Sequence, residues 1–167
     1  MSETRPSMNL LATRRRRPDA QAIVKGNAKY LGLSGVVRFY QTRRGVLVCV
    51  EISGLPEAVE PCGNRIFTFH IHSGSQCTGD STDPFADALT HYNTGNCPHL
   101  AHAGDLVPLF SNHGYAFEVF LTDRFTVCEI VGRTVIVHSG PDDFTTQPSG
   151  DAWSKIACGQ IRAMAPR

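Results

Sequence analysis

The chain has 167 residues, with 16 lysines and arginines against 15 aspartates and glutamates, so its formal net charge is +1. This length favours one soluble globular domain with its own core, and the balanced charge gives no general attraction to nucleic acid or anionic lipid. Its apolar stretches fall far short of the ~20 residues of a membrane-spanning helix, which excludes an integral membrane protein of the helical kind.

The N-terminal segment differs in amino-acid composition from the rest of the chain. Residues 1–20 are polar, basic and interrupted by proline, and we interpret them as a mobile tail before a single domain over residues 21–167. The basic run Arg14–Arg17 is followed by Pro18 and Asp19, not by the apolar core of an export signal. The sequence as written therefore predicts a cytoplasmic protein. The alternative is an exported protein whose leader is missing from this chain.

Short stretches rich in β-branched and aromatic residues follow at 36–40, 46–52, 66–72, 115–120 and 134–138. The first two flank a turn of hairpin length that contains Gly45. No window shows the apolar spacing of an amphipathic helix, so the pattern indicates an all-β sandwich or barrel. Residues 73–106 and 139–157 carry almost no strand signal, and loops of this length usually carry function.

Six of the seven histidines lie in or beside these loops. His70 and His72 are two residues apart on a predicted strand, so their side chains share one face. Further candidate ligands follow in the loop and at the end of a later strand: His91, His99, His102, Asp105 and His138. The seventh histidine, His113, lies in a predicted turn and is expected to be exposed.

The ligand types narrow the choice of metal. Imidazole suits zinc and copper, whereas calcium and magnesium prefer a shell of oxygen atoms. Three histidines and one aspartate would complete a tetrahedral zinc site, and three or four histidines without an acidic ligand suit copper. Two four-coordinate sites need more ligands than six histidines and one aspartate supply. One histidine would have to serve both metals, and His91 is placed to be that bridge.

The segments that carry these residues resemble the copper/zinc superoxide dismutases, with features of the bacterial-type branch. The matching segments are Phe69–His72, His91–Asn93, His99, His102–Leu106, Gly132–Thr134, His138, Gly140–Asp143 and Ala157–Gly159. The resemblance spans about residues 22–161. It implies an eight-stranded Greek-key β-barrel or sandwich of immunoglobulin-like type, with long metal-binding and electrostatic loops.

The resemblance also implies a function and a set of site residues. Copper would be bound by His70, His72, His91 and His138, and zinc by His91, His99, His102 and Asp105. Superoxide would be converted to dioxygen and hydrogen peroxide, with His91 carrying a proton. Asp142 would bond to one histidine of each metal, and Cys77 would form a disulfide with Cys158. Superoxide, a copper donor and a second copy in a homodimer are the expected partners.

One position departs from the family pattern at the expected active site. Lys155 stands where the family has an arginine that guides the anion toward copper. The positive charge is kept but the planar two-donor fork is lost, so we expect a lowered dismutase activity. The alternative is a non-catalytic protein that buffers or delivers zinc or copper on the same fold.

The remaining cysteines and the single tryptophan allow simpler expectations. Cys62 and Cys97 lie near the metal loop, where they could form a second disulfide or remain free thiols, because a sequence does not set their separation. Cys49 and Cys128 lie in strand-like sequence and are expected to be buried. Trp153 is expected to pack within its loop.

Overall fold

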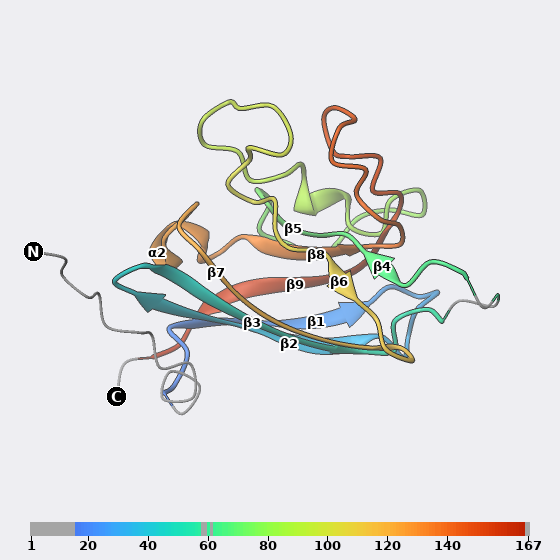
Figure 1. The fold of residues 1–167 in the computed structure, drawn as a ribbon, viewed down its shortest axis with the longest axis horizontal. Helices are drawn as coiled ribbons and strands as arrows, with labels where there is room; N and C mark the ends of the chain where they lie inside the picture. The colour runs from blue at the N-terminus through green and yellow to red at the C-terminus, as the bar shows by residue number, and fades with distance from the viewer. Residues whose placement is uncertain (1–15, 58–59, 61, 166–167) are drawn as a thin grey trace, which may run out of the picture.

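The computed structural model describes residues 16–57, 60 and 62–165, and its main element is an antiparallel seven-stranded sheet (Figure 1). In spatial order its strands are β5 (Phe69–His72), β8 (Thr134–His138), β9 (Lys155–Ala163), β1 (Ala20–Gly26), β2 (Ser34–Thr42), β3 (Gly45–Ser53) and β7 (Tyr115–Thr122). A two-stranded pair is formed by β4 (Ile66–Phe67) and β6 (Leu109–Phe110). The helical segments are η1 (Ala86–Ala88) and α2 (Val127–Ile130).

The connections between these strands cross from one side of the sheet to the other. The chain leaves β3 near one edge and returns as β5 at the opposite edge, and it crosses back again between β7 and β8. This connectivity agrees with the expected Greek-key arrangement. The long segments between β5 and β6 and between β8 and β9 lie together above the sheet at the top of Figure 1.

The core explains why the strands form where the β-branched and aromatic residues lie. Val37 and Phe39 of β2 alternate with more exposed neighbours and pack with Val48 and Val50 of β3. All four side chains are fully buried. Each such side chain contributes roughly 1.5–3 kcal/mol through burial.

Several expected boundaries differ from the structure. The strand expected over 66–72 is interrupted at Thr68, which separates β4 from β5. Strand β9 begins at Lys155, inside the segment expected to be a loop, and pairs with β8 and β1. Of the expected tail, residues 1–15 lie outside the described residues, and Ala20 already belongs to β1.

The expectation for Cys128 was wrong, whereas Cys49 is buried as predicted. Cys128 is exposed because it lies on α2, where Val127 and Ile130 form the buried side of the helix. The signal for this helix is a capping box, in which the Glu129 carboxylate accepts a hydrogen bond from the backbone N–H of Thr126. Within the described residues, no helix has both the length and the apolar character needed to cross a membrane.

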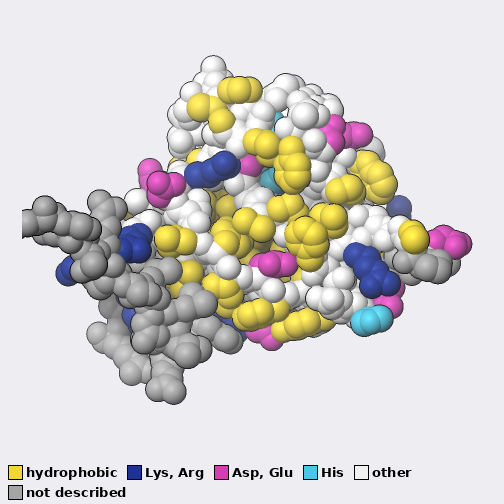
Figure 2. All heavy atoms as spheres, in the orientation of Figure 1, with side chains coloured by type: hydrophobic (Ala, Val, Ile, Leu, Met, Phe, Trp, Pro, Cys, Tyr) yellow, Lys and Arg dark blue, Asp and Glu magenta, His cyan; other side chains and the backbone are white. Residues whose placement is uncertain are grey.

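Figure 2 shows exposed apolar side chains over β6 and β7 on the face that it presents. The exposed apolar residues of β6 and β7 are Phe110, Tyr115, Phe117 and Leu121, each at least 40% exposed. Strand β7 is an edge of the seven-stranded sheet. The face therefore combines apolar surface with a strand edge.

Candidate metal centre

The first two residues of the centre come from β5, whose side chains alternate between core and site. Phe69 and Ile71 are fully buried in the hydrophobic core. His70 and His72 must therefore project from the other face of the strand. The sequence pattern alone is enough to place this pair side by side.

The loop after β5 folds back along this strand and brings its ligands to the pair. Isolated bridges join His70 to Asp105 and His72 to His91. Gly104 permits this close approach, since a Cβ atom there would lie 2.2 Å from a β5 carbonyl oxygen. Backbone pairing therefore fixes two loop ligands against two strand ligands.

The first cluster consists of buried histidines whose potential donor atoms all lie within 4.8 Å of one another: His70, His72, His91 and His138. The Nδ1 atom of His72 lies 2.9 Å from the carbonyl oxygen of Leu89, and that of His138 lies 3.2 Å from the carbonyl oxygen of Trp153. Since a carbonyl only accepts, each Nδ1 carries the proton and donates it. The Nε2 atoms of His72 and His138 then carry lone pairs, and they face each other at 3.4 Å.

The second cluster meets the same distance criterion and contains one acidic residue: His91, His99, His102 and Asp105. The Asp105 carboxylate lies 3.0 Å from Nδ1 of His91 and 3.1 Å from Nδ1 of His99. Nδ1 of His102 lies 3.3 Å from the same carboxylate. Three imidazole nitrogens converging on one carboxylate are the donor set of a tetrahedral zinc site.

His91 belongs to both clusters and turns a different nitrogen to each. Its Nδ1 faces Asp105, while its Nε2 is buried and has no hydrogen-bond partner. Nδ1 of His70 is also buried without a hydrogen bond. Buried polar atoms normally have partners. These lone pairs belong to imidazole rings, which suit copper and zinc, and they fit two metal ions bound on either side of His91.

Asp142 connects the two clusters from behind, as the resemblance implied. Its buried carboxylate lies 3.2 Å from Nε2 of His70 and 2.9 Å from Nε2 of His99. Each of these nitrogens donates to the carboxylate, which leaves the Nδ1 atom of each ring as the metal-facing donor. The backbone N–H of Phe144 also donates to Asp142, at 2.7 Å. At Gly150 a Cβ atom would lie 1.9 Å from the carboxylate.

Burial keeps three of the histidines, His70, His72 and His138, in the neutral form that binds metal. It lowers the pKa of His70 to about 4 and that of His138 to about 3, and it lowers the pKa of His72 well below its ordinary value. For Asp142, burial alone would raise the pKa. The hydrogen bonds from His70 and His99 outweigh burial and lower the pKa of Asp142 to about 2. His70, His72 and His138 are therefore neutral at pH 7, and Asp142 is ionised.

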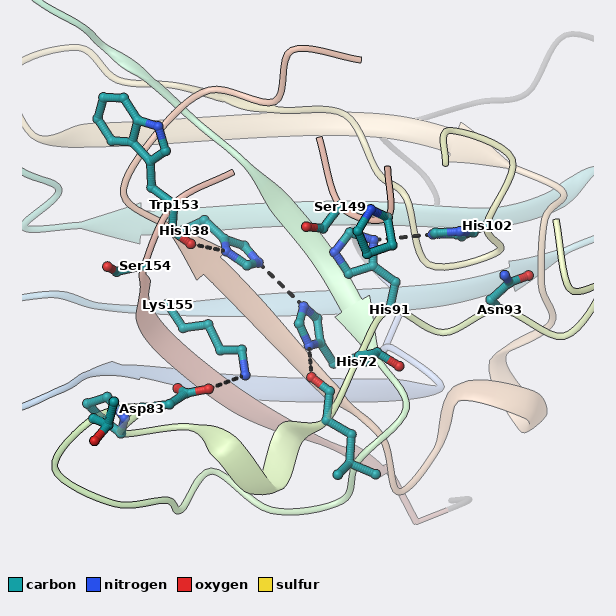
Figure 3. Close-up of a pocket in the computed structure, with 15 residues that line it drawn as sticks. His72, Asp83, His91, Asn93, His102, His138, Ser149, Trp153, Ser154 and Lys155 are labelled. Carbon is teal, nitrogen blue, oxygen red and sulfur yellow. Dashed lines mark hydrogen bonds and ion pairs between the residues drawn. The ribbon is translucent and has the colours of Figure 1, made fainter. Parts of the chain in front are cut away.

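A pocket of about 530 Å³ opens over His72, His91 and His138 (Figure 3). Trp153 stands at its rim with 64% of its surface exposed, and its ring packs against Gly140 of the same loop. Lys155 reaches the pocket from β9. Its Nζ donates to the Asp83 carboxylate at 2.7 Å and to the carbonyl oxygen of Phe85 at 3.1 Å.

The cysteines separate into one bonded pair and free thiols. Cys77 and Cys158 form a disulfide with a Cα–Cα distance of 5.6 Å, which ties the loop after β5 to β9. The second disulfide considered for Cys62 and Cys97 is absent, since both thiols are free. Asn93 holds the backbone of Cys97 through two hydrogen bonds. Cys62 lies in the connection from β3 to β4, which is separate from the Cys97 loop in Figure 1.

Two side chains near the centre had no signal in the sequence. Arg124 donates through one nitrogen to the backbone carbonyls of Leu100, His102 and Asp105, at 3.0–3.2 Å. It therefore supports the loop of the second cluster. The second side chain without a sequence signal is Asp83, which accepts from Lys155. His113 is exposed in a turn, as predicted.

Comparisons with known proteins agree with this geometry. The profile of the family described as copper/zinc superoxide dismutase matches residues 33–161. A Cu-Zn superoxide dismutase of Schizosaccharomyces pombe is 31% identical over 158 residues, covering 85% of this chain and 96% of that protein. Cu-Zn superoxide dismutase 2 of Aquifex aeolicus is 28% identical over 158 residues, covering 83% and 87%. The solved Cu/Zn superoxide dismutase from Brucella abortus superposes with a TM-score of 0.71 at 25% identity, covering 84% of this chain and 98% of that one.

Proposed function

The chain belongs to the copper/zinc superoxide dismutase family of oxidoreductases, and we propose that its Lys155 makes the dismutation of superoxide slower than an arginine would. The observation that carries the dismutase function is His91, which is shared between two complete ligand sets. A protein that only held zinc would have no use for His70, His72 and His138 around the other nitrogen of that ring.

The residues would hold the two metals in distinct ways. His70, His72, His91 and His138 would hold copper, and His91, His99, His102 and Asp105 would hold zinc. Copper supplies one-electron oxidation and reduction, whereas zinc has no redox chemistry and stabilises the geometry of its ligands.

The protein itself contributes a proton carrier. Two superoxide ions and two protons give one dioxygen and one hydrogen peroxide, so protons must be delivered within the site. The buried Nε2 atom of His91 has no protein partner, so it could hold a proton whenever it does not bind copper. Its Nδ1 stays directed at Asp105, which fixes the ring during that transfer. His91 is therefore placed to pass a proton from Nε2 to the peroxide that forms.

Lys155 supplies the positive charge of the pocket, with reduced capacity to bind an anion. An ammonium group has three N–H donors, and two of them are used by Asp83 and Phe85. An arginine has five donors in a planar fork and could keep both contacts while offering a pair to the anion. We therefore expect Lys155→Arg to raise kcat/KM by about two- to tenfold through anion guidance.

The test is the dismutation rate of protein loaded one-to-one with copper and zinc, with free copper chelated. We expect a rate well above that of chelated copper. Lys25→Arg, on an exposed residue of β1, is the matched control for Lys155→Arg. A rate equal to the blank with both metals bound would favour a metal carrier and refute the dismutase function. An unchanged kcat/KM in Lys155→Arg would refute the role given to Lys155.

A further inference from the structure

The cation of the substrate pocket is already paired within the protein. Nζ of Lys155 lies 2.7 Å from the carboxylate of Asp83, and the two side chains are 15% and 39% exposed. Figure 3 shows this contact at the side of the pocket, near His72 and His138. The charge of Lys155 is felt in the site, because it contributes to the lowered pKa of His138.

The pairing removes most of the net charge from the pocket wall. Of the described residues that line the pocket, Lys155 is the one lysine or arginine and Asp83 the one acidic residue. Opposite charges this close act on a distant anion as a dipole, whose field falls off faster than that of a single charge. An approaching anion therefore meets weaker attraction than an unpaired lysine would give.

The position of Asp83 is set by its own turn and not by the ion pair alone. Its Oδ1 atom accepts the backbone N–H of Phe85 at 3.0 Å, and its own N–H donates to Asp80 at 2.9 Å. The carbonyl oxygen of Phe85 is the second acceptor of Lys155. One short turn thus presents two acceptors to the same ammonium group. This distinguishes the pair from exposed ion pairs between two flexible side chains, which contribute little.

We propose that Asp83 is a positioning residue that lowers the affinity of the pocket for small monovalent anions. It holds Nζ of Lys155 beside His72 and His138 and offsets the charge of that ammonium group. The inference rests on the proposed dismutase function, because superoxide is such an anion. It implies that substrate association is slower, and less sensitive to ionic strength, than the lysine alone would make it.

Asp83→Asn removes the charge and keeps the turn. The amide oxygen can still accept the N–H of Phe85, so the amide nitrogen faces Lys155 and the ion pair is lost. The carbonyl oxygen of Phe85 still holds Nζ. In protein loaded with copper and zinc, we expect the Kd of azide, read from the copper absorption band, to fall by about three- to tenfold. We also expect the dismutation rate at low salt to rise about two- to tenfold and to decrease more steeply with ionic strength.

The matched control is Asp87→Asn, which makes the same change of charge in the same loop. Asp87 is exposed and does not line the pocket. Asp83→Ser, whose hydroxyl can also accept the N–H of Phe85, is a second variant and must change azide affinity in the same direction.

Two outcomes would overturn the proposal: an azide Kd that is unchanged or higher in the Asp83 variants, or an equal change in Asp87→Asn. Azide binding requires no turnover. A wild-type protein that binds both metals but lacks dismutase activity would therefore refute the proposed function, while the azide measurement would still decide the role of Asp83.

Discussion

Asp142→Asn tests how strongly the two metal sites depend on one buried carboxylate. The Asp142 side chain is 3% exposed and accepts from His70, His99 and the backbone N–H of Phe144. An asparagine has the same shape, but it offers one acceptor oxygen and turns an NH₂ group toward the remaining donors. At least one ligand histidine then faces a donor where it had an acceptor.

The magnitude follows from the bonds that are lost. A hydrogen bond to a charged group contributes about 1.5–3 kcal/mol, and loss of such a partner of a metal ligand typically weakens metal binding by about 10–100-fold. We expect the Kd for zinc to rise within that range, because His99 loses its orientation. Copper binding should weaken through His70. The Kd for each metal can be measured by competition with a chelator of known affinity.

The matched control is Asp151→Asn, an exposed carboxylate in the same loop. Asparagine tolerates the positive φ of 50° at that position. We expect its metal affinities to match the wild type. If Asp142→Asn retained both affinities within about twofold, the histidines would not depend on this carboxylate, and the reasoning from its hydrogen bonds would be refuted.

Three further predictions concern stability and the loop of the second cluster. The pKa values of His70 and His138 are lowered to about 4 and about 3, so below about pH 6.5 the unfolded chain binds more protons than the folded one. In urea unfolding of the metal-free protein, the free energy of unfolding should therefore fall by roughly 2 kcal/mol for each histidine from pH 7.5 to pH 5. A free energy of unfolding that does not change with pH would contradict this. Cys77→Ser opens a bridge that spans 81 residues and should lower the free energy of unfolding by about 2–4 kcal/mol; a loss below about 1 kcal/mol in urea would show that the bridge is dispensable. Arg124→Met removes the donor to three loop carbonyls and should weaken zinc binding about fivefold in chelator competition, equivalent to about 1 kcal/mol. A zinc affinity equal to that of the wild type would show that the loop keeps its conformation without Arg124.

Parts of the fold that depend on local patterns could be predicted, and parts that depend on pairing could not. The strands β2, β3, β7 and β8 lie where β-branched and aromatic residues are concentrated. The beginning of β9 at Lys155 was not predicted, because its first residues are ordered by pairing with β8 and not by their own pattern. Cys128 was misplaced because a four-residue helix is too short to show a periodic pattern.

By itself the sequence determined the chemistry of the centre. The alternation of Phe69 and Ile71 with His70 and His72 places two ligands on one face, and the count of ligands requires a shared histidine. Only the tertiary structure decided which nitrogen of His91 faces each cluster, and that Lys155 is paired with Asp83 across 72 residues of chain. The physical reason is that strand side chains follow a fixed two-residue period. The path of a long loop has no such period and is set by contacts with distant residues.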